Sequence, residues 1–187
     1  MIRTDIIALQ TKIGADPDGF WGPKSIAACQ RHLRRLMPSP NPWPKTDEKS
    51  LTAFYGVPGD ESQLAALNVE GLGLAYEGRP VTAMRVHKKV ATSLERILTE
   101  ISKGPHAKLL ARYAGVYNNR PMRGGSRPSL HARAAAIDID PFRNGLVAHW
   151  PMQATMPLEV MEAFAREGWL PAGAFWSRDA MHFQATQ

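Results

Sequence analysis

Two short stretches, far apart in the chain, carry the side chains best suited to chemistry. The first holds His131 and, seven residues later, Asp138; the second holds Asp179 and, three residues later, His182. Two imidazoles and one carboxylate are three protein ligands of the kind that a catalytic zinc site uses, with a fourth position left for water. The remaining carboxylate could accept a proton from that water. These residue types predict a hydrolytic site with one Zn²⁺ ion.

The spacing of these residues leaves two interpretations open. A gap of seven places His131 and Asp138 on different elements, and it differs from the helical H-E-x-x-H pattern of many metalloproteases. We expect His131 in a loop and Asp138 in the strand that follows. The same four residues would also fit two unconnected His–Asp hydrogen bonds in a protein core. Spacing alone does not separate a metal centre from that arrangement.

The other histidines and the single cysteine do not occur in a comparable motif with carboxylates. No carboxylate lies beside His87, which we interpret as a capping or core residue. We assign structural roles to three further histidines, namely His32, His106 and His149. The single cysteine, Cys29, excludes an internal disulfide and lies in an apolar helical run, which predicts a buried and inert thiol.

Charge and composition restrict the possible partners. The chain of 187 residues carries a net charge of +6, and residues 101–137 contain seven Lys or Arg and no acidic residue. This balance indicates an anionic partner, such as nucleic acid, an envelope polymer or a membrane surface. No recognition helix or aromatic RNA motif is present, so we expect no nucleic-acid partner. No apolar run approaches the ~20 residues of a membrane span, so we expect no membrane insertion.

The hydrophobic patterns predict an α+β protein that contains both helices and strands. We expect helices over 2–13, 20–36, 46–55, 87–102 and 157–167. We expect strands over 81–86, 136–139 and 181–184, and a strand followed by a turn over 113–120. The segments 141–150 and 169–176 are expected to be loops. Pro23 in a first turn and Gly14 and Gly168 just past helix ends mark helix boundaries.

The N-terminal part resembles the peptidoglycan-binding module of cell-wall hydrolases, a three-helix bundle. The resemblance is carried by Leu9-Gln10, Ile13-Gly14 and Asp18-Gly19-Phe20-Trp21-Gly22-Pro23-Lys24-Ser25. It implies a wall-binding domain over residues 1–55. The alternative is a helical bundle that packs on its neighbour and binds no ligand. We expect Phe20 and Trp21 to be core anchors for the turn that they follow.

The remainder of the chain, residues 56–187, resembles the M15 family of zinc peptidases. The paired motif is Ser129-x-His131-x-x-Ala134-x-Ala136-x-Asp138 and Trp176-x-x-Asp179-x-x-His182-Phe183. The family includes D-alanyl-D-alanine carboxypeptidases, dipeptidases and the L-alanyl-D-glutamate endopeptidases of bacteriophage endolysins. One departure is Ala134, where the family usually has glycine.

The resemblance implies a role for each matching residue. His131, Asp138 and His182 would bind one zinc ion, and Asp179 would be the general base. A guanidinium near the metal would stabilise the oxyanion of the tetrahedral intermediate. We choose Arg120 for that role, with Arg123 as the rival and a substrate-binding candidate.

Two further residues near the motif have candidate roles. We expect Ser129 to hydrogen-bond the substrate or a metal ligand. Asp140 would either support a zinc histidine from behind or face solvent on its strand.

Together these features predict a two-domain peptidoglycan hydrolase that acts as a monomer. The two resemblances imply a small three-helix N-terminal bundle followed by a zinc peptidase domain with a small, mostly antiparallel sheet flanked by helices. The N-terminus, Met1-Ile2-Arg3-Thr4-Asp5, lacks a signal-peptide pattern. We therefore expect a phage-type endolysin that is held in the host cytoplasm and acts on the cell wall after release. The expected cleavage is the L-alanyl-D-glutamate bond of the stem peptide.

The expected activity has two rivals. One is a D-alanyl-D-alanine carboxypeptidase or D,D-endopeptidase that uses the same site. The other is a non-catalytic cell-wall-binding protein with a degenerate peptidase fold. That protein would lack a metal ligand or the base, and the motif lacks none.

Overall fold

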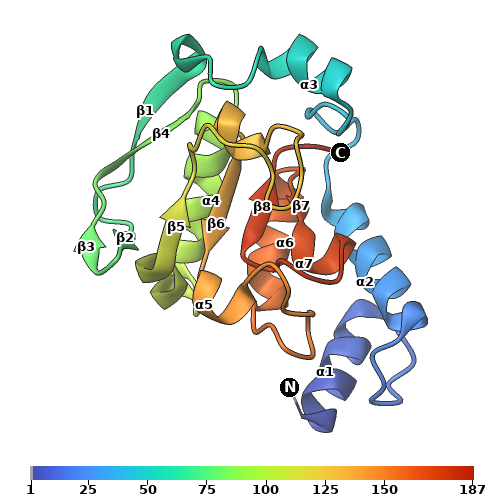
Figure 1. Cartoon of the computed structure of the whole chain (residues 1–187). Coiled ribbons are helices and arrows are strands. Elements are labelled where there is room, and N and C mark those ends of the chain that lie inside the picture. The colour runs from blue at the N-terminus through green and yellow to red at the C-terminus, as the bar shows by residue number, and fades with distance from the viewer. Residues whose placement is uncertain (1) are drawn as a thin grey trace.

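The structure is a computed structural model that describes residues 2–187. Helices and small antiparallel sheets alternate along it, which confirms the predicted α+β class (Figure 1). None of the helices within residues 2–187 has the length and apolar character needed to cross a bilayer.

A four-stranded antiparallel sheet forms the centre of the C-terminal part. Its strand order is β5-β6-β8-β7, so β5 and β7 are the outer strands. The strands are β5 (Tyr113–Gly115), β6 (Ala136–Ile139), β7 (Leu170–Pro171) and β8 (His182–Gln184). The predicted strands at 136–139 and 181–184 are therefore confirmed, while the predicted strand from 113 is shorter than expected.

Helices α4 (Ala91–Lys103) and α6 (Leu158–Arg166) lie side by side behind this sheet (Figure 1). The inward face of α4 is aliphatic and fully buried at Leu94, Ile97 and Leu98. On α6, the ring of Phe164 stacks on that of Phe183 of β8 at a centroid distance of 3.9 Å. This packing fixes β8 against the helical layer. Both helices were correctly predicted from their amphipathic patterns.

Several short elements depart from the predictions. His87 belongs to strand β4 (Ala83–His87), so α4 begins four residues later than expected. Two predicted loops contain the short helices α5 (Pro141–Asn144) and α7 (Ala172–Phe175). The sequence patterns also missed β1 (Leu64–Asn68) and the hairpin β2 (Ala75–Tyr76) and β3 (Arg79–Pro80). The 3₁₀ turns are η1 (Glu61–Gln63), η2 (Ala107–Arg112) and η3 (Leu130–Arg133).

The three N-terminal helices are present close to the expected positions. They are α1 (Arg3–Ile13), α2 (Pro23–Leu36) and α3 (Glu48–Tyr55). Gly14 ends α1 in the left-handed conformation, with φ of 71°. Asp47 caps α3, since its side chain accepts a hydrogen bond from the Ser50 backbone N–H at 2.9 Å.

Helix α3 lies apart from α1 and α2, next to the C-terminus (Figure 1). The Tyr55 hydroxyl donates to the Ala185 carbonyl oxygen at 2.6 Å, so α3 packs on the C-terminal part of the chain instead of completing a bundle. Helix α2 packs on α1 and also on α6 and α7. The proline-rich segment 38–44 separates α2 from α3, and it is pinned where the Trp43 indole donates to the Glu167 carbonyl at 2.7 Å.

Buried side chains from both halves form one continuous cluster, to which Leu33 and Tyr55 contribute along with the sheet. The division after residue 55 remains a prediction, and the two parts share this core. Trp21 is an anchor as expected, because its ring packs edge-on against Trp150 at 5.4 Å. The expectation for Phe20 is wrong: its side chain is 71% exposed.

Candidate metal centre

Strand pairing places two of the predicted ligands next to each other. Asp138 of β6 lies directly opposite His182 of β8 in the antiparallel register. Directly opposed residues point to the same face of a sheet, so both side chains meet above it. His131 arrives from η3, the turn before β6. Residues from three separate elements thus converge on one point.

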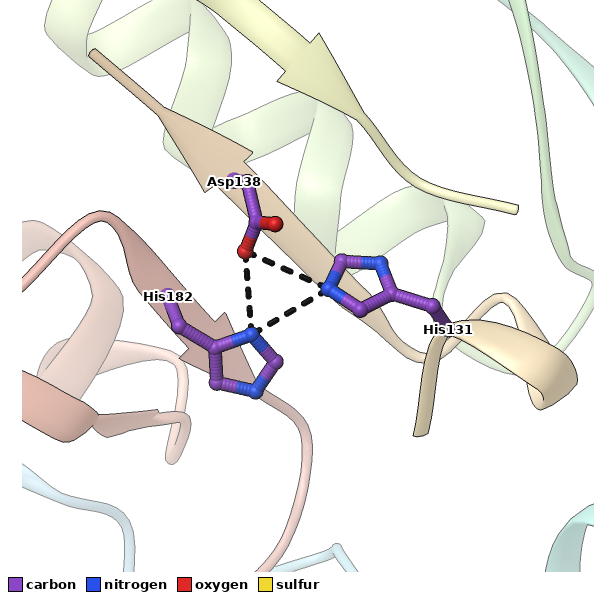
Figure 2. A group of neighbouring side chains, drawn as sticks. All are labelled: His131, Asp138 and His182. Atoms are coloured by element: carbon purple, nitrogen blue, oxygen red, sulfur yellow. Dashed lines mark hydrogen bonds and ion pairs between the residues drawn. The ribbon is translucent and has the colours of Figure 1, made fainter. Parts of the chain in front are cut away.

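The three candidate ligand atoms form a small triangle (Figure 2). His131 Nε2 lies 3.2 Å from Asp138 Oδ1 and 3.2 Å from His182 Nδ1. His182 Nδ1 lies 3.0 Å from the same Asp138 oxygen. The group could hold a metal ion, because each residue offers one ligand atom and all three atoms lie within 4.8 Å of one another.

Hydrogen bonds on the far side of each imidazole indicate which nitrogen is free. His131 Nδ1 lies 2.7 Å from the Val116 carbonyl oxygen, which can only accept. His182 Nε2 lies 3.2 Å from Gln184 Oε1, and the Gln184 amide nitrogen donates to Thr186 at 2.7 Å. In the neutral histidines the two facing nitrogens therefore present lone pairs to each other and to a carboxylate. Three converging lone pairs repel unless a cation or an added proton lies between them, so the donor set fits a metal ion.

The pKa shifts follow from this crowding. Burial raises the pKa of Asp138, but hydrogen bonds and charge from His131 and His182 outweigh it and leave that pKa well below its ordinary value. Burial lowers the pKa of His182, whereas the hydrogen bond to Asp138 and the charges of Asp138 and Asp179 raise it, and the net shift is upward. Both shifts reflect the attraction between an ionised Asp138 carboxylate and positive charge at the imidazoles beside it.

Asp179 lies beside this group with one oxygen uncommitted. The residue is only 9% exposed, and within residues 2–187 its Oδ1 has no hydrogen-bond partner. Burial raises its pKa above the ordinary value, partly offset by the charges of His182 and His131. Its backbone is left-handed, with φ of 59°, an uncommon conformation for a residue other than glycine. A buried carboxylate with a raised pKa and a free oxygen is suited to proton transfer.

A cavity of about 260 Å³, here called the site cavity, opens over the group. Arg120 and Arg123 both line it. Arg120 Nη1 donates to the neighbouring Pro121 carbonyl at 3.0 Å, whereas Arg123 is close enough for its charge to lower the pKa of Asp179. Arg123 is therefore better placed than Arg120 to act near the base. The oxyanion role of either arginine remains a prediction.

Ser129 is buried, and its hydroxyl accepts a hydrogen bond from the His131 backbone N–H at 3.3 Å. It thereby caps η3 and holds the ligand loop. Ala134, at the end of the same turn, has φ of 51° and ψ of 33°, the left-handed conformation that glycine adopts without steric cost. The backbone thus gives a physical reason for glycine at this position and tolerates an alanine.

The expectation for Asp140 is wrong in both of its forms. Its side chain is fully buried, neither facing solvent nor contacting a metal-site histidine. Its carboxylate accepts from Arg112 Nη1 at 3.2 Å and from the Asn144 amide at 3.3 Å. Asp140 thus connects η2 with α5 at the end of β6, and the alternation of the Ile/Asp run concealed that burial.

Sequence reasoning missed several residues around the site. Gln184 lies two positions after His182 on one strand and therefore shares its face, a signal that strand periodicity contained. The Trp176 ring stacks on that of His182, with centroids 5.7 Å apart. Arg178 lines the site cavity. No sequence signal pointed to Val116, because it acts through its carbonyl oxygen.

His87, His32 and Cys29 make contacts or are buried in ways that agree with the structural roles expected for them. His87 is buried, and its ring nitrogen lies 3.0 Å from the Tyr55 carbonyl oxygen. His32 lies 2.8 Å from Glu162. Burial raises the pKa of the Cys29 thiol to about 12, so it remains protonated and unreactive at neutral pH.

Residues 123–185 match the sequence profile of an M15 peptidase family described as D-alanyl-D-alanine carboxypeptidase. The matched segment contains all three candidate ligands and Asp179, and it supports an M15 peptidase domain in this part of the chain. No curated protein and no solved structure was found to match the chain.

Proposed function

We propose that the protein is a zinc-dependent peptidoglycan hydrolase that cuts the stem peptides of the bacterial cell wall. The observation that carries the proposal is the convergence of three lone-pair donors beside a buried carboxylate with a free oxygen. The family match over the same residues supports peptidase chemistry. His131, Asp138 and His182 would hold the ion.

A bound zinc ion would supply a Lewis acid that polarises the scissile carbonyl and acidifies water. Asp179 accepts the proton of the attacking water on its carboxylate and passes it to the leaving amine. Arg123, or Arg120 as first chosen from the sequence, stabilises the negative charge that develops on the carbonyl oxygen. Ser129 keeps His131 in place through its backbone N–H.

We assign the cleavage to the L-alanyl-D-glutamate bond. The D-glutamate on the leaving side of that bond carries a free carboxylate. The site cavity contains three arginines, Arg120, Arg123 and Arg178, which suit such a group. The second candidate is release of the terminal D-alanine, which the family description favours. A terminal carboxylate would meet the same arginines.

The test is digestion of purified peptidoglycan with and without a chelator, followed by mass spectrometry of the new termini. New N-terminal D-glutamate supports the assigned bond, and released D-alanine supports the second candidate. A protein that binds the wall but releases neither product would contradict the hydrolase proposal and leave a wall-binding protein.

We further propose that the N-terminal helices bind the wall polymer and that the protein acts as a monomeric, phage-type endolysin. The exposed ring of Phe20 lines a cavity of about 410 Å³ with Asp18 and Lys24, which suits a sugar ring. Phe20→Ala should weaken sedimentation with insoluble wall and leave hydrolysis of a small soluble peptide intact. Unchanged sedimentation would contradict wall binding at this cavity. A point variant is preferable to deletion of residues 1–55, because Trp43 and Tyr55 belong to the shared core.

A further inference from the structure

A second cavity adjoins the candidate metal centre on the side away from Asp179. Its volume is about 620 Å³, and it shares Arg120, Arg123, His131 and Asp138 with the site cavity. We call it the side groove. Two of the candidate ligands, His131 and Asp138, thus line both cavities, and a chain bound at the centre can continue in both directions.

Two elements far apart in the sequence form the walls of the side groove. One wall is the outer strand β5 and the residues after it, up to Asn118. The other is β4 with Ala83, Met84 and Arg85, and Tyr76 of the β2–β3 hairpin lies in the same lining. Figure 1 shows the β1–β4 ribbon standing beside β5. The side groove is therefore formed in part by the β1–β4 ribbon, of which the sequence patterns predicted β4 and missed β1.

The lining of the side groove is aromatic and nearly neutral away from the centre. Tyr76 and Tyr113 pack edge-to-face with ring centroids 6.4 Å apart. The Arg85 guanidinium lies 5.0 Å from the centre of the Tyr117 ring, and Glu61 pairs with Arg85 at 2.6 Å. Because Glu61 compensates Arg85, this wall offers aromatic surface, chiefly the exposed ring of Tyr76, without a net charge. Such surfaces suit sugar rings better than they suit acidic peptides.

The position of Asp179 orients the substrate. Asp179 lines the site cavity and is absent from the lining of the side groove. A base that returns its proton to the leaving amine must lie near that amine, so the leaving side occupies the site cavity. The acyl side, which leads back toward the glycan, then occupies the side groove. In a wall stem peptide cut after its first residue, a single L-alanine separates the cut from the sugar.

We propose that the side groove is a saccharide subsite, which binds the N-acetylated amino sugar that carries the stem peptide. This inference rests on the proposed function, because it requires cleavage close to the sugar. A groove of this size cannot be filled by one alanine, and the lactyl-linked sugar is the next group along the chain. The protein would then recognise the junction of glycan and peptide.

The activity test compares two soluble substrates with the same scissile bond. One carries N-acetylmuramic acid on the L-alanine nitrogen, and the other carries an acetyl group. We expect kcat/KM for the sugar-linked substrate to exceed that for the acetylated one by about tenfold, the effect of one good aromatic contact. Tyr76→Ala should bring this ratio close to one. Phe142→Ala, which also removes an exposed aromatic ring but lies outside the side groove, should leave the ratio unchanged.

A binding test makes the subsite measurable without turnover. N-acetylmuramoyl-L-alanine should bind the wild-type protein in a calorimetric titration, and Tyr76→Ala should weaken that binding by about tenfold. Equal kcat/KM values for the two substrates, or no binding of N-acetylmuramoyl-L-alanine, would overturn the saccharide subsite while leaving the hydrolase proposal intact. Binding without cleavage of either substrate would support the subsite and count against the assigned bond.

Discussion

The hydrogen bond from His182 Nε2 to Gln184 Oε1 orients a candidate metal ligand. A single substitution at Gln184 can remove this hydrogen bond. Partners of this kind fix the imidazole tautomer and typically affect metal affinity by about 10–100-fold. Gln184→Leu should weaken zinc binding by about that factor, measured by competition with a chromophoric chelator. Gln184→Glu keeps an acceptor for the His182 N–H and should restore affinity. Equal affinities for all three proteins would contradict the assigned tautomer.

A substitution at Asp179 should separate zinc binding from catalytic turnover. Asn is the matched replacement, because it tolerates the left-handed backbone at this position and keeps the side-chain shape. We expect Asp179→Asn to bind zinc normally and to lose activity by about 10²–10⁴-fold, the usual contribution of a general base. Metal content and kcat on a soluble peptide measure the two effects. Wild-type turnover in this variant would move the base elsewhere.

Ala134 combines an unfavourable backbone with a buried methyl group. Glycine would relieve about 1 kcal/mol of left-handed strain. It would also lose about 0.8 kcal/mol from the buried carbon and up to about 1 kcal/mol through the freer unfolded chain. Ala134→Gly should therefore change the free energy of unfolding by less than about 1 kcal/mol. Ala134→Val, β-branched at a left-handed and fully buried position, should cost more than about 2 kcal/mol in urea denaturation.

At the scale of elements, Arg133 connects α3 to the turn that carries His131. Its buried guanidinium pairs with Glu48 and donates to the Thr52 hydroxyl at 3.1 Å and the Gly56 carbonyl at 3.0 Å. Its Nη1 has no partner within residues 2–187, so the charge depends on these few contacts. Helix α3 thus supports the ligand-bearing turn from outside.

Removal of one partner should show the strength of this connection. Glu48→Gln leaves the guanidinium buried without its counter-charge, although Glu48 is itself half-exposed. We expect a loss of about 1–3 kcal/mol in the free energy of unfolding. Lys49→Gln, a neighbouring change on α3 that involves no such pair, is the control and should cost less than about 0.5 kcal/mol. A Glu48→Gln protein as stable as the control would show that the pair contributes nothing.

The sequence predicted elements whose hydrophobic pattern is local, and it failed where distant contacts decide. Pro23 and the apolar spacing that follows it placed α2 correctly. Leu64–Asn68 is rich in Ala and Leu, which favour helix, yet it is a strand because it pairs with β4. Phe20 was assigned to the core from its residue type, although the turn directs it outward. The candidate ligands were identifiable because their residue types and motif are distinctive, whereas the side groove depends on a ribbon of which the local patterns predicted β4 and missed β1.

At the scale of the whole molecule, an ion that binds only the folded state should raise the melting temperature. Zinc at 100 times its dissociation constant adds about 2.7 kcal/mol. For a protein of this size, about 1 kcal/mol corresponds to 2–4 °C, so calorimetry should detect a rise of roughly 5–10 °C. His182→Ala should remove the rise. An equal zinc effect in that variant would place the ion at another site.

The stacking of Trp176 on His182 should make occupancy of the candidate metal centre measurable by tryptophan fluorescence. This indole is 44% exposed and lies over a ring whose protonation and occupancy determine its ability to quench emission. Filling the centre should therefore alter the intensity and wavelength of tryptophan fluorescence, while the four more buried indoles supply a constant background. A Trp176→Phe protein would lack that response, and the difference between the two spectra would report ion uptake in real time without any added dye.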